Sequence, residues 1–335
     1  MRILFITNLY PPYHIGGYEI ACKDIAEGLK KRGHTIKVLT STYGMKKPVI
    51  NDDVARLLDI KLKLNRPQTL FEKFSALFFN SQNYTITKNV IEEFNPHIVS
   101  YWNINGISAS TIIAAEKIGV TKVFHLFDRS LSYIRKIGAK SLSNYLFFNK
   151  LNIKNLISSS SELKKDYVNR GFKESSITVI PHGVDIDKFP YRRKGVEGVL
   201  KLLYVGQLWE GKGVHILLKA VGLLKKENVD VNLTVIGNGE PIYISFLKKI
   251  CKEMRIVDNV QFIKKVERKD LIRYYQNNHI LIFPSIWKEP FGIVLLEAMA
   301  TGTPVIASKN GGPLDIVRDN LTGFFFKPGD YKDLA

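Results

Sequence analysis

Residues 284–313 read PSIWKEPFGIVLLEAMATGTPVIASKNGGP and decide how the rest of the chain is interpreted. The stretch holds two glutamates eight positions apart, Glu289 and Glu297. Residues 290–292, Pro-Phe-Gly, end a loop, and the apolar run IVLLEAMA that follows predicts a helix. One carboxylate is therefore expected in the loop before the helix, and the other about one and a half turns inside it.

The start of such a helix favours an anion. Its unpaired N–H groups and the positive end of its dipole attract a group such as a phosphate. A carboxylate on the first turns can accept two hydrogen bonds from the neighbouring hydroxyls of a ribose, so the pattern predicts a nucleotide site. Two glutamates at this spacing are also compatible with an ordinary loop acid and a solvated helix residue.

The surrounding motifs favour the nucleotide site. EPFG precedes the helix, EAMATGTPVIAS runs through it, and GGP stands at the start of the next helix. This combination closely resembles the donor-site signature of the retaining glycosyltransferases of family 4 (glycosyl transferases group 1), and the resemblance covers nearly the whole chain. It implies the GT-B fold, with two Rossmann-like parallel-sheet domains facing a central cleft. It also implies transfer of a sugar from a nucleotide-diphosphate sugar to an acceptor hydroxyl.

The hydrophobic pattern agrees with two α/β domains. A chain of 335 residues can form two cores, and short apolar runs alternate with helix-length amphipathic segments. The strands expected in the first half are Arg2–Thr7, Thr35–Thr40, His97–Tyr101, Lys122–Phe127, Asn155–Ser159 and Thr178–Ile180, with helices at Tyr18–Lys31, Gly106–Ile118 and Glu162–Arg170. The strands expected in the second half are Leu200–Val205, Val231–Ile236, Val260–Ile263, His279–Phe283 and Pro304–Ala307.

The domain boundaries follow from composition. Residues 1–182 are expected to form the acceptor-side domain and residues 199–335 the nucleotide-sugar donor domain. Residues 183–198 lie in a stretch rich in proline, glycine and charge, without periodicity, and are interpreted as a linker. The sequence stops at DYKDLA, where a helix begins, so we expect the C-terminal crossover helix that the resemblance implies to be missing.

Composition argues against several other classes. Hydrophobic residues make up 45% of the chain, and its apolar runs are far shorter than the roughly 20 residues that cross a bilayer. MRILFITN leads directly into fold sequence and has no signal-peptide cleavage pattern. The two cysteines, Cys22 and Cys251, give no disulfide framework and indicate a reducing compartment, so a cytoplasmic location is expected.

No cofactor or metal ion is expected. The seven histidines have no ligand-like spacing to one another or to the cysteines. Asp185-Ile-Asp187 matches the Asp-x-Asp pattern with which GT-A glycosyltransferases bind a metal, but its place in the linker favours a structural turn. Gly237 and Gly239 lack the third glycine and the acid of a dinucleotide fingerprint, which argues against NAD.

The net charge of +18 is unevenly distributed. Residues 1–194 carry 30 Lys and Arg against 16 Asp and Glu, whereas the remainder carries 19 against 15. This is either a basic solvated surface or a surface for anionic membrane lipid, a pyrophosphate-linked acceptor or nucleic acid. Residues 129–161 contain no acid and mix basic residues with aromatics, and residues 61–79 have a similar character. Both segments fit interfacial helices on the inner face of the cell membrane, or core helices with extended lysines.

The resemblance implies that two glycine loops face the donor diphosphate. Gly16 and Gly17 precede the first helix, where the absence of a Cβ allows a ligand to approach backbone N–H groups, although a simple turn also explains them. Lys212 lies in a second glycine turn, as a cation for the leaving diphosphate or as a solvated lysine. The resemblance implies an arginine five residues before Lys212, and this chain has Gln207 there, which brings a hydrogen bond but no charge.

The resemblance implies further donor contacts. Glu289 would contact the hydroxyls of the donor sugar, and Glu297 would bind the ribose. The amides of Phe291, Gly292 and Ile293 would hold sugar and phosphate. Lys265 and Val266 occupy the positions where relatives hold the nucleobase through backbone contacts. UDP-sugars are favoured over GDP-sugars.

The largest departure from the family pattern is in KVFHLFDRS, residues 122–130. Relatives place a His-Asp pair at the end of this strand, near the transferred sugar, and here the pair is Phe127 and Asp128. His125 lies two residues earlier, on the same face of a strand. It is either a replacement for the missing histidine or a core residue.

These inferences predict a retaining, metal-independent hexosyltransferase with Glu289, Lys212 and His125 as catalytic candidates. The acceptor is expected to be a glycan or lipid-linked intermediate of surface polysaccharide synthesis. The alternative is a non-catalytic protein on the same scaffold that binds membrane or nucleic acid, which Phe127 and Gln207 favour. No nucleic-acid-binding motif is found, so no nucleic-acid partner is expected.

Overall fold

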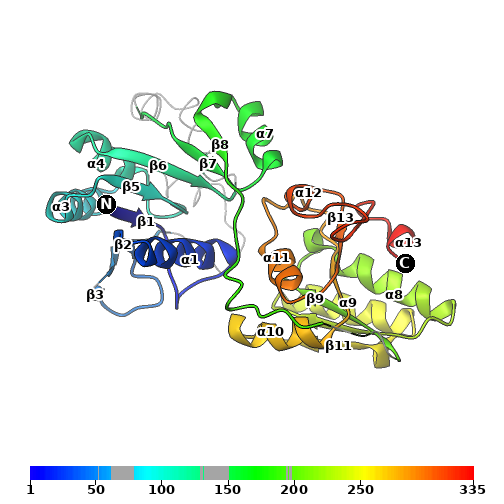
Figure 1. Cartoon of the computed structure of the whole chain (residues 1–335). Coiled ribbons are helices and arrows are strands. Elements are labelled where there is room, and N and C mark those ends of the chain that lie inside the picture. The colour runs from blue at the N-terminus through cyan, green and yellow to red at the C-terminus, as the bar shows by residue number, and fades with distance from the viewer. Residues whose placement is uncertain (52, 62–78, 129–130, 132–150, 194, 196–197) are drawn as a thin grey trace. The chain divides into compact units, whose positions relative to one another are not determined.

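The computed structural model describes residues 1–51, 53–61, 79–128, 131, 151–193, 195 and 198–335. The chain divides into two compact units, Met1–Ile180 and Pro181–Ala335. Figure 1 shows the first unit in blue to green and the second in green to red. The division falls between Ile180 and Pro181, just before the predicted linker at 183–198, so the linker belongs to the second unit.

The first unit is built on an eight-stranded sheet with the order β3-β4-β2-β1-β5-β6-β7-β8. All neighbouring strands are parallel except the pair β3 and β4. The strands are β1 Arg2–Ile6, β2 Thr35–Ser41, β3 Val49–Asn51, β4 Val54–Leu58, β5 Ile98–Tyr101, β6 Thr121–Leu126, β7 Leu156–Ser158 and β8 Ile177–Val179. The helices in the described residues of this unit are α1 Gly17–Lys31, α3 Ser81–Phe94, α4 Ser110–Ile118 and α7 Ser161–Asn169, with a 3-10 turn at Glu174–Ser176.

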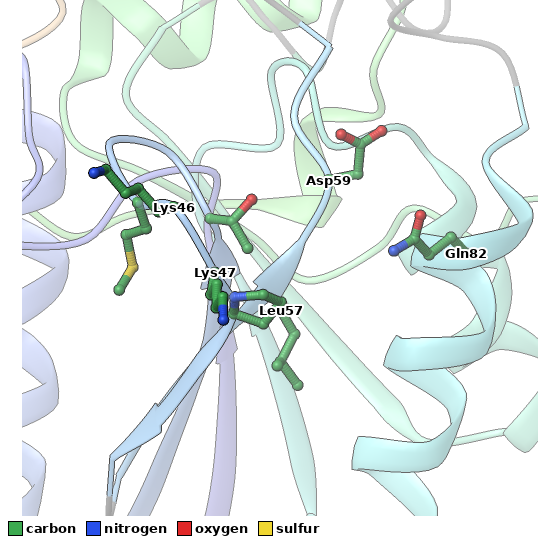
Figure 2. A pocket seen from close by; sticks show the side chains of 8 residues that line it. Lys46, Lys47, Leu57, Asp59 and Gln82 are labelled. Atoms are coloured by element: carbon green, nitrogen blue, oxygen red, sulfur yellow. The ribbon is translucent and has the colours of Figure 1, made fainter.

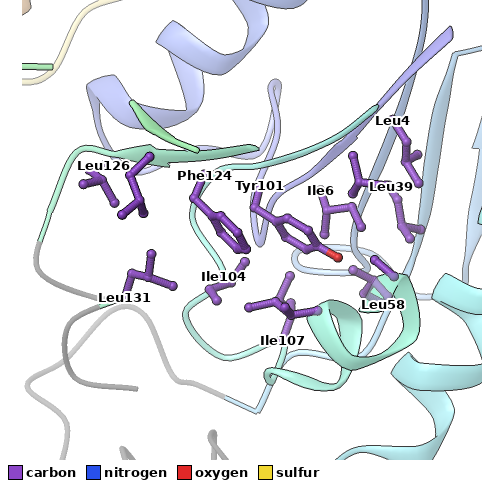
Figure 3. Packing of buried hydrophobic residues seen from close by; sticks show 14 of the residues in the cluster. Leu4, Ile6, Leu39, Leu58, Tyr101, Ile104, Ile107, Phe124, Leu126 and Leu131 are labelled. Carbon is purple, nitrogen blue, oxygen red and sulfur yellow. The ribbon is translucent and has the colours of Figure 1, made fainter. Parts of the chain in front are cut away.

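A buried apolar cluster holds this sheet together, as Figure 3 shows. Leu4 and Ile6 point from β1 into the same cluster as Leu39 from β2, because alternate residues of a strand lie on one face. Tyr101 and Phe124 stack with ring centroids 5.1 Å apart. The Tyr101 hydroxyl donates to the carbonyl of Thr111 across 2.7 Å, so the cluster contains a satisfied polar group.

The second unit has a six-stranded parallel sheet with the order β11-β10-β9-β12-β13-β14. Its strands are β9 Leu200–Val205, β10 Val231–Ile236, β11 Val260–Ile263, β12 Ile280–Phe283, β13 Val305–Ser308 and β14 Phe324–Phe326. Its helices are α8 Val214–Lys226, α9 Pro241–Glu253, α10 Arg268–Asn277, α11 Ile293–Ala300, α12 Pro313–Ile316 and α13 Tyr331–Leu334, with 3-10 turns at Glu210–Lys212 and Val257–Asn259.

Both faces of this second sheet are covered. Along β9, Leu202 and Tyr204 belong to one apolar cluster, and Leu203 and Val205 belong to another. The first cluster includes residues of α8 and α9, and the second includes residues of α10 and α11. Parallel strands buried on both faces have near-continuous apolar sequences, which is why LKLLYV and VNLTVI are readable as strands. The loops that follow these strands meet at one edge of the sheet.

Every predicted strand is present, with no end displaced by more than one residue. The helix predicted at Gly106–Ile118 was wrong at its start, because α4 begins only at Ser110. Gly106 and Ser108 have positive φ angles of 84° and 70°, which a right-handed helix excludes. No helix in the described ranges combines the length and apolarity needed to cross a membrane.

Candidate functional site

The centre of the candidate site in the second unit is an ion pair between the Lys212 ammonium and Oε1 of Glu289. Lys212 ends the turn after β9, and Glu289 lies in the loop after β12, the neighbouring strand. Their side chains are 20% and 10% exposed, so the pair is largely withdrawn from water. The two catalytic candidates of this unit, distant in sequence, are therefore in contact.

A buried serine positions the Glu289 carboxylate. The Ser285 hydroxyl lies 3.1 Å from Glu289 Oε1, from the carbonyl oxygen of Gly211 and from that of Trp287. The same Gly211 carbonyl accepts from the N–H groups of Ile286 and Trp287, across 3.0 and 2.9 Å. The loops after β9 and β12 are thus joined by backbone bonds, and Ser285 links them to the carboxylate. Sequence analysis missed Ser285, because its role depends on contacts between distant segments.

The GGP motif, residues 311–313, packs against the loop that carries Glu289. The Gly312 N–H donates to the carbonyl of Glu289 across 2.7 Å. A Cβ on Gly311 would lie 2.5 Å from that carbonyl oxygen, and one on Gly312 would lie 2.3 Å from the Cα of Phe291. Glycine is required at both positions because two backbones approach each other here. The EPFG and GGP motifs, which are separate in the sequence, therefore pack directly against each other through their backbones.

Helix α11 begins at Ile293, immediately after Glu289 and its loop. Gly292 is its N-cap with a φ of 113°, and no side chain caps the helix. The predicted amides of Gly292 and Ile293 therefore lie at a helix N-terminus, where N–H groups and the dipole favour an anion. Phe291 is buried and packs edge-on against His182, with ring centroids 5.6 Å apart. Burial lowers the pKa of His182 to about 4, so this ring is neutral at pH 7.

Glu297 is buried inside α11 and bound by protein groups. The Arg268 Nε–H donates to its Oε1 across 2.6 Å, and the Tyr275 hydroxyl donates to Oε2 across 2.8 Å. Arg268 also lies over the ring of Phe189, 5.2 Å from its centroid. The carboxylate therefore connects α11 to α10. Its contact with a ribose stays a prediction, and neither Arg268 nor Tyr275 was identified from the sequence.

The remaining donor-side candidates lie at the same edge of the sheet. Gln207 is exposed after β9, and Lys265 and Val266 follow β11. The loops between them touch through their backbones, since a Cβ on Gly237 would lie 1.8 Å from the Gly206 carbonyl oxygen. The Lys265 N–H donates to the Asn238 side chain across 3.0 Å, which ties the loop after β11 to the loop after β10.

In the first unit, Gly16 is the N-cap of α1 and Gly17 is its first residue. The Glu19 carboxylate accepts from the Gly16 N–H across 2.9 Å, which is the one half of a capping box that a glycine N-cap allows. Glu19 is buried, and this burial raises its pKa. The G-x-x-E spacing carries the signal for this cap, although the sequence analysis did not use it. The glycines are thus held at a helix N-terminus by a neighbouring carboxylate.

His125 belongs to an aromatic cluster beside this glycine loop. Its ring stacks on Trp102 with centroids 4.1 Å apart and planes at 12°. Trp102 also approaches Phe127 at 5.5 Å, so positions 125 and 127 lie on one side, as their spacing predicted. Tyr18, in the first turn of α1, stacks on Phe127 at 4.5 Å and donates to the His125 carbonyl across 2.7 Å. The cluster brings His125 next to the helix that begins at Gly17.

A polar pocket lies elsewhere on the first unit, between the loop after β2, the end of β4 and the start of α3 (Figure 2). Lys46 and Lys47 line one side of it, and Asp59 and Gln82 line the other (Figure 2). The full lining is Thr42, Met45, Lys46, Lys47, Pro48, Leu57, Asp59 and Gln82. Sequence analysis did not identify this pocket, because three separate segments form it.

The described residues contain no group of three or more His, Cys, Asp or Glu side chains that could hold a metal ion. The Asp185 carboxylate accepts from the Asp187 N–H across 3.3 Å and approaches the Lys188 ammonium at 3.7 Å. These contacts fit the turn that the sequence predicted for Asp185-Ile-Asp187. The two segments proposed to contact a membrane, 61–79 and 129–161, lie largely outside the described residues.

Two doubly wound parallel sheets, with phosphate-suited helix starts at their edges, are the features of a GT-B glycosyltransferase. Residues 15–188 match the family model "Glycosyltransferase Family 4", and residues 187–335 match "Glycosyl transferases group 1". The chain belongs to glycosyltransferase family 4. The predicted family and fold are confirmed.

Relatives extend over both units. The chain is 25% identical to an uncharacterized glycosyltransferase of Methanocaldococcus jannaschii, over 100% of this chain and 87% of the relative. It is 31% identical to the D-inositol 3-phosphate glycosyltransferase of Paenarthrobacter aurescens, over 47% of this chain but only 41% of that protein.

Solved structures show the same fold. The structure of Anabaena HepE in complex with UDP and glucose gives a TM-score of 0.71 at 20% identity, over 100% of this chain and 88% of that one. Sucrose-phosphate synthase from Thermosynechococcus elongatus gives 0.75 at 19% identity, over 99% and 87%.

Proposed function

We propose that this protein transfers a glycosyl group from a nucleoside-diphosphate sugar, UDP rather than GDP, to a hydroxyl of a glycan or lipid-linked acceptor. The reaction retains the anomeric configuration and uses no metal ion. The observation that carries the proposal is the Lys212–Glu289 pair directly before the N-terminus of α11, in a family 4 chain. The UDP and glucose bound to the Anabaena relative support the choice of donor.

The Lys212–Glu289 pair can contact both groups joined by the bond that breaks, Lys212 the diphosphate and Glu289 the sugar. When the bond between the anomeric carbon and the diphosphate breaks, negative charge grows on the phosphate, which the Lys212 ammonium and the amides of Gly292 and Ile293 stabilise. Gln207 adds a hydrogen bond without charge. Glu289 accepts from hydroxyls of the donor sugar. Without donor, the ion pair holds each group against the other, and Ser285 keeps the carboxylate oriented for the sugar.

Retention follows from a front-face exchange. The bond from the anomeric carbon to the diphosphate breaks while the bond from that carbon to the acceptor oxygen forms on the same face. The hydroxyl proton of the acceptor passes to the departing phosphate oxygen, so no enzyme nucleophile is required. The protein's contribution is charge stabilisation and positioning.

The first unit supplies the acceptor side in this proposal. Residues 1–180 carry 26 basic against 14 acidic residues, and Lys46 and Lys47 line a pocket there. Both features suit an acceptor that carries phosphate, such as a lipid-linked pyrophosphate intermediate, and peripheral contact with an anionic membrane. His125 is assigned to the transferred sugar as a catalytic candidate.

Donor binding and hydrolysis test the proposal. The wild type, Lys212→Met and Lys212→Arg are incubated with UDP- and GDP-sugars in EDTA, and thermal shift and released sugar are measured. We expect UDP-sugars to stabilise the wild type and to be hydrolysed slowly. Lys212→Met should lower the hydrolysis rate about 100-fold, and Lys212→Arg should restore part of it. The non-catalytic alternative is supported if no nucleotide binds and vesicles or duplex DNA bind in a salt-sensitive manner.

A further inference from the structure

Two of the three tryptophans of the chain lie at the surface of the second unit. Trp209 and Trp287 are 39% and 41% exposed, whereas Trp102 is buried in the first unit at 3%. The rings of Trp209 and Trp287 lie 6.0 Å apart between centroids, with their planes at 62°. Two adjacent indoles at the surface of a folded unit contribute little to its core, so they indicate a binding surface.

Gly211 holds both tryptophans in place. A Cβ on Gly211 would lie 2.2 Å from the Cζ3 and Cη2 atoms of Trp209, so the indole packs directly on the glycine backbone. The Trp287 N–H donates to the Gly211 carbonyl across 2.9 Å. Any other residue at position 211 displaces the Trp209 ring. The indoles are therefore pre-positioned, which reduces the entropy lost when a ligand packs on them.

The indole pair and the Lys212–Glu289 ion pair lie on the same two loops. Trp209 and Lys212 belong to one short turn after β9, and Trp287 and Glu289 to one loop after β12. The Ser285 hydroxyl lies 3.1 Å from the carbonyl oxygen of Trp287 and 3.1 Å from Glu289 Oε1. A ligand lying on the indoles is thus next to the groups assigned to the donor sugar and diphosphate.

We propose that Trp209 and Trp287 form a stacking platform for a pyranose ring bound beside Glu289, an inference that rests on the proposed function. A pyranose has an apolar C–H face that fits an indole, and a polar rim that suits the neighbouring exposed Glu210 and Lys288. One acid and one base flank the platform, and residues 195–335 carry 19 basic against 15 acidic residues. This near balance favours a neutral ring over an anionic membrane, which requires a basic cluster.

The three indole N–H signals of the ¹⁵N-labelled protein test the platform directly. Trp209→Phe, Trp287→Phe and Trp102→Phe assign the signals. The protein is then titrated with UDP, with UDP-glucose and UDP-galactose, with cellohexaose and maltohexaose, and with phosphatidylglycerol vesicles. We expect sugar-bearing probes to shift the Trp209 and Trp287 signals. The Trp102 indole stacks on His125, which is assigned to the transferred sugar, so its signal is followed separately and does not decide the test. A shift by UDP-sugars but not UDP assigns the ring to the donor, and a shift by an oligosaccharide alone assigns it to the acceptor.

Variants measure the contribution of stacking. Trp209→Ala is expected to weaken binding of the effective sugar probe roughly 3- to 10-fold, and Trp209→Phe to weaken it less. Gly211→Ala should reproduce the loss, because it displaces the Trp209 ring. A cooperative thermal unfolding transition verifies that each variant is folded.

Three results overturn the platform. Shifts caused by vesicles alone would make the surface a membrane contact. No shift of Trp209 or Trp287 while UDP-sugars still stabilise the protein would also overturn it, and would leave the proposed function standing. A protein that no nucleotide stabilises and no sugar probe shifts would refute both.

Discussion

The Arg268 side chain, at the start of α10, donates from Nε to Oε1 of Glu297 inside α11 across 2.6 Å. Glu297 is only 3% exposed, and the Tyr275 hydroxyl completes its surroundings. The second glutamate of the donor signature, as the family resemblance assigns it, therefore also forms a structural ion pair between two helices. Removing the Glu297 carboxylate therefore weakens the contact between α10 and α11 as well as the binding of any ligand that it contacts.

We expect Glu297→Gln to lower the free energy of unfolding by about 2 kcal/mol or more, because the Arg268 guanidinium then faces a neutral amide in a poorly solvated position. Urea unfolding measures this change. Glu227→Gln is the matched control, since Glu227 is exposed at the end of α8 and its replacement should be nearly neutral. Equal stabilities of the two variants would show that the Arg268 pair contributes nothing to folding.

Ribose recognition by Glu297 can be separated from this structural role with deoxynucleotides. If the carboxylate binds the ribose hydroxyls, wild-type protein should bind UDP about 10-fold more tightly than its 2′- or 3′-deoxy analogues. In Glu297→Gln, compared at a temperature where it is folded, this preference should largely disappear, whereas Arg268→Gln should keep it. Calorimetric titration gives the affinity of each of the three proteins for UDP and for its deoxy analogues. A preference of the same size in all three proteins would exclude Glu297 as the ribose ligand.

The stability of the second unit is expected to fall in mild acid because of His182. Burial lowers the pKa of this ring to about 4, below the value of about 6.5 in an unfolded chain. Between these values the unfolded state binds the additional proton. The contribution of His182 to stability is therefore complete above pH 6.5 and is lost as the pH falls toward 4, by up to roughly 3 kcal/mol. Unfolding curves at pH 7 and 4.5 should show a smaller loss for His182→Gln than for the wild type. Parallel losses would refute the assignment.

Strands were predictable because the pattern that defines them is local. Strands buried on both faces, such as LKLLYV in β9, are continuous apolar runs bounded by turns. β4 escaped prediction because VARLL contains Arg56, which looks like a surface residue in the sequence. In the fold Arg56 is buried, and its guanidinium donates to the carbonyls of Tyr10 and Pro11 across 3.0 and 2.7 Å. A polar residue whose partners lie distant in the chain breaks the pattern that sequence reasoning uses.

In the candidate site too, local features could be predicted from the sequence and contacts between distant segments could not. Lys212 and Glu289 could be chosen from the sequence, because glycine turns after apolar strands mark the edge where ligands bind. Their contact with each other could not, and neither could Ser285 or Arg268, because each of these depends on which strands are neighbours in the sheet. Local motifs thus gave the loops, while the order of the strands determines which side chains meet.

Gly213 should tolerate no side chain. It has a φ of 70°, and a Cβ there would lie 1.9 Å from the carbonyl oxygen of Pro284. Gly213→Ala is expected to destabilise the protein by about 2 kcal/mol or more and to weaken donor binding, since the turn that carries Lys212 must move. Gly183→Ala is the control, because nothing lies within 4 Å of its Cβ position. Thermal unfolding and UDP titration measure both effects. A Gly213→Ala protein with wild-type stability would show that the loops after β9 and β12 are not packed as described.

The stack of His125 on Trp102 allows catalysis and packing to be tested separately. His125→Phe retains a planar ring against Trp102 and removes the nitrogens, so we expect it to lower the thermal midpoint less than His125→Ala does. If the imidazole contacts the transferred sugar, kcat for transfer or donor hydrolysis should fall roughly 10-fold or more in this variant, with little change in donor affinity. His125→Ala also removes the stack and should lower the thermal midpoint in addition. Wild-type kcat in His125→Phe, together with a destabilised His125→Ala, would establish His125 as a packing residue. Phe127 and the aromatic rings around it would then fill the space of the family's histidine without providing its nitrogens.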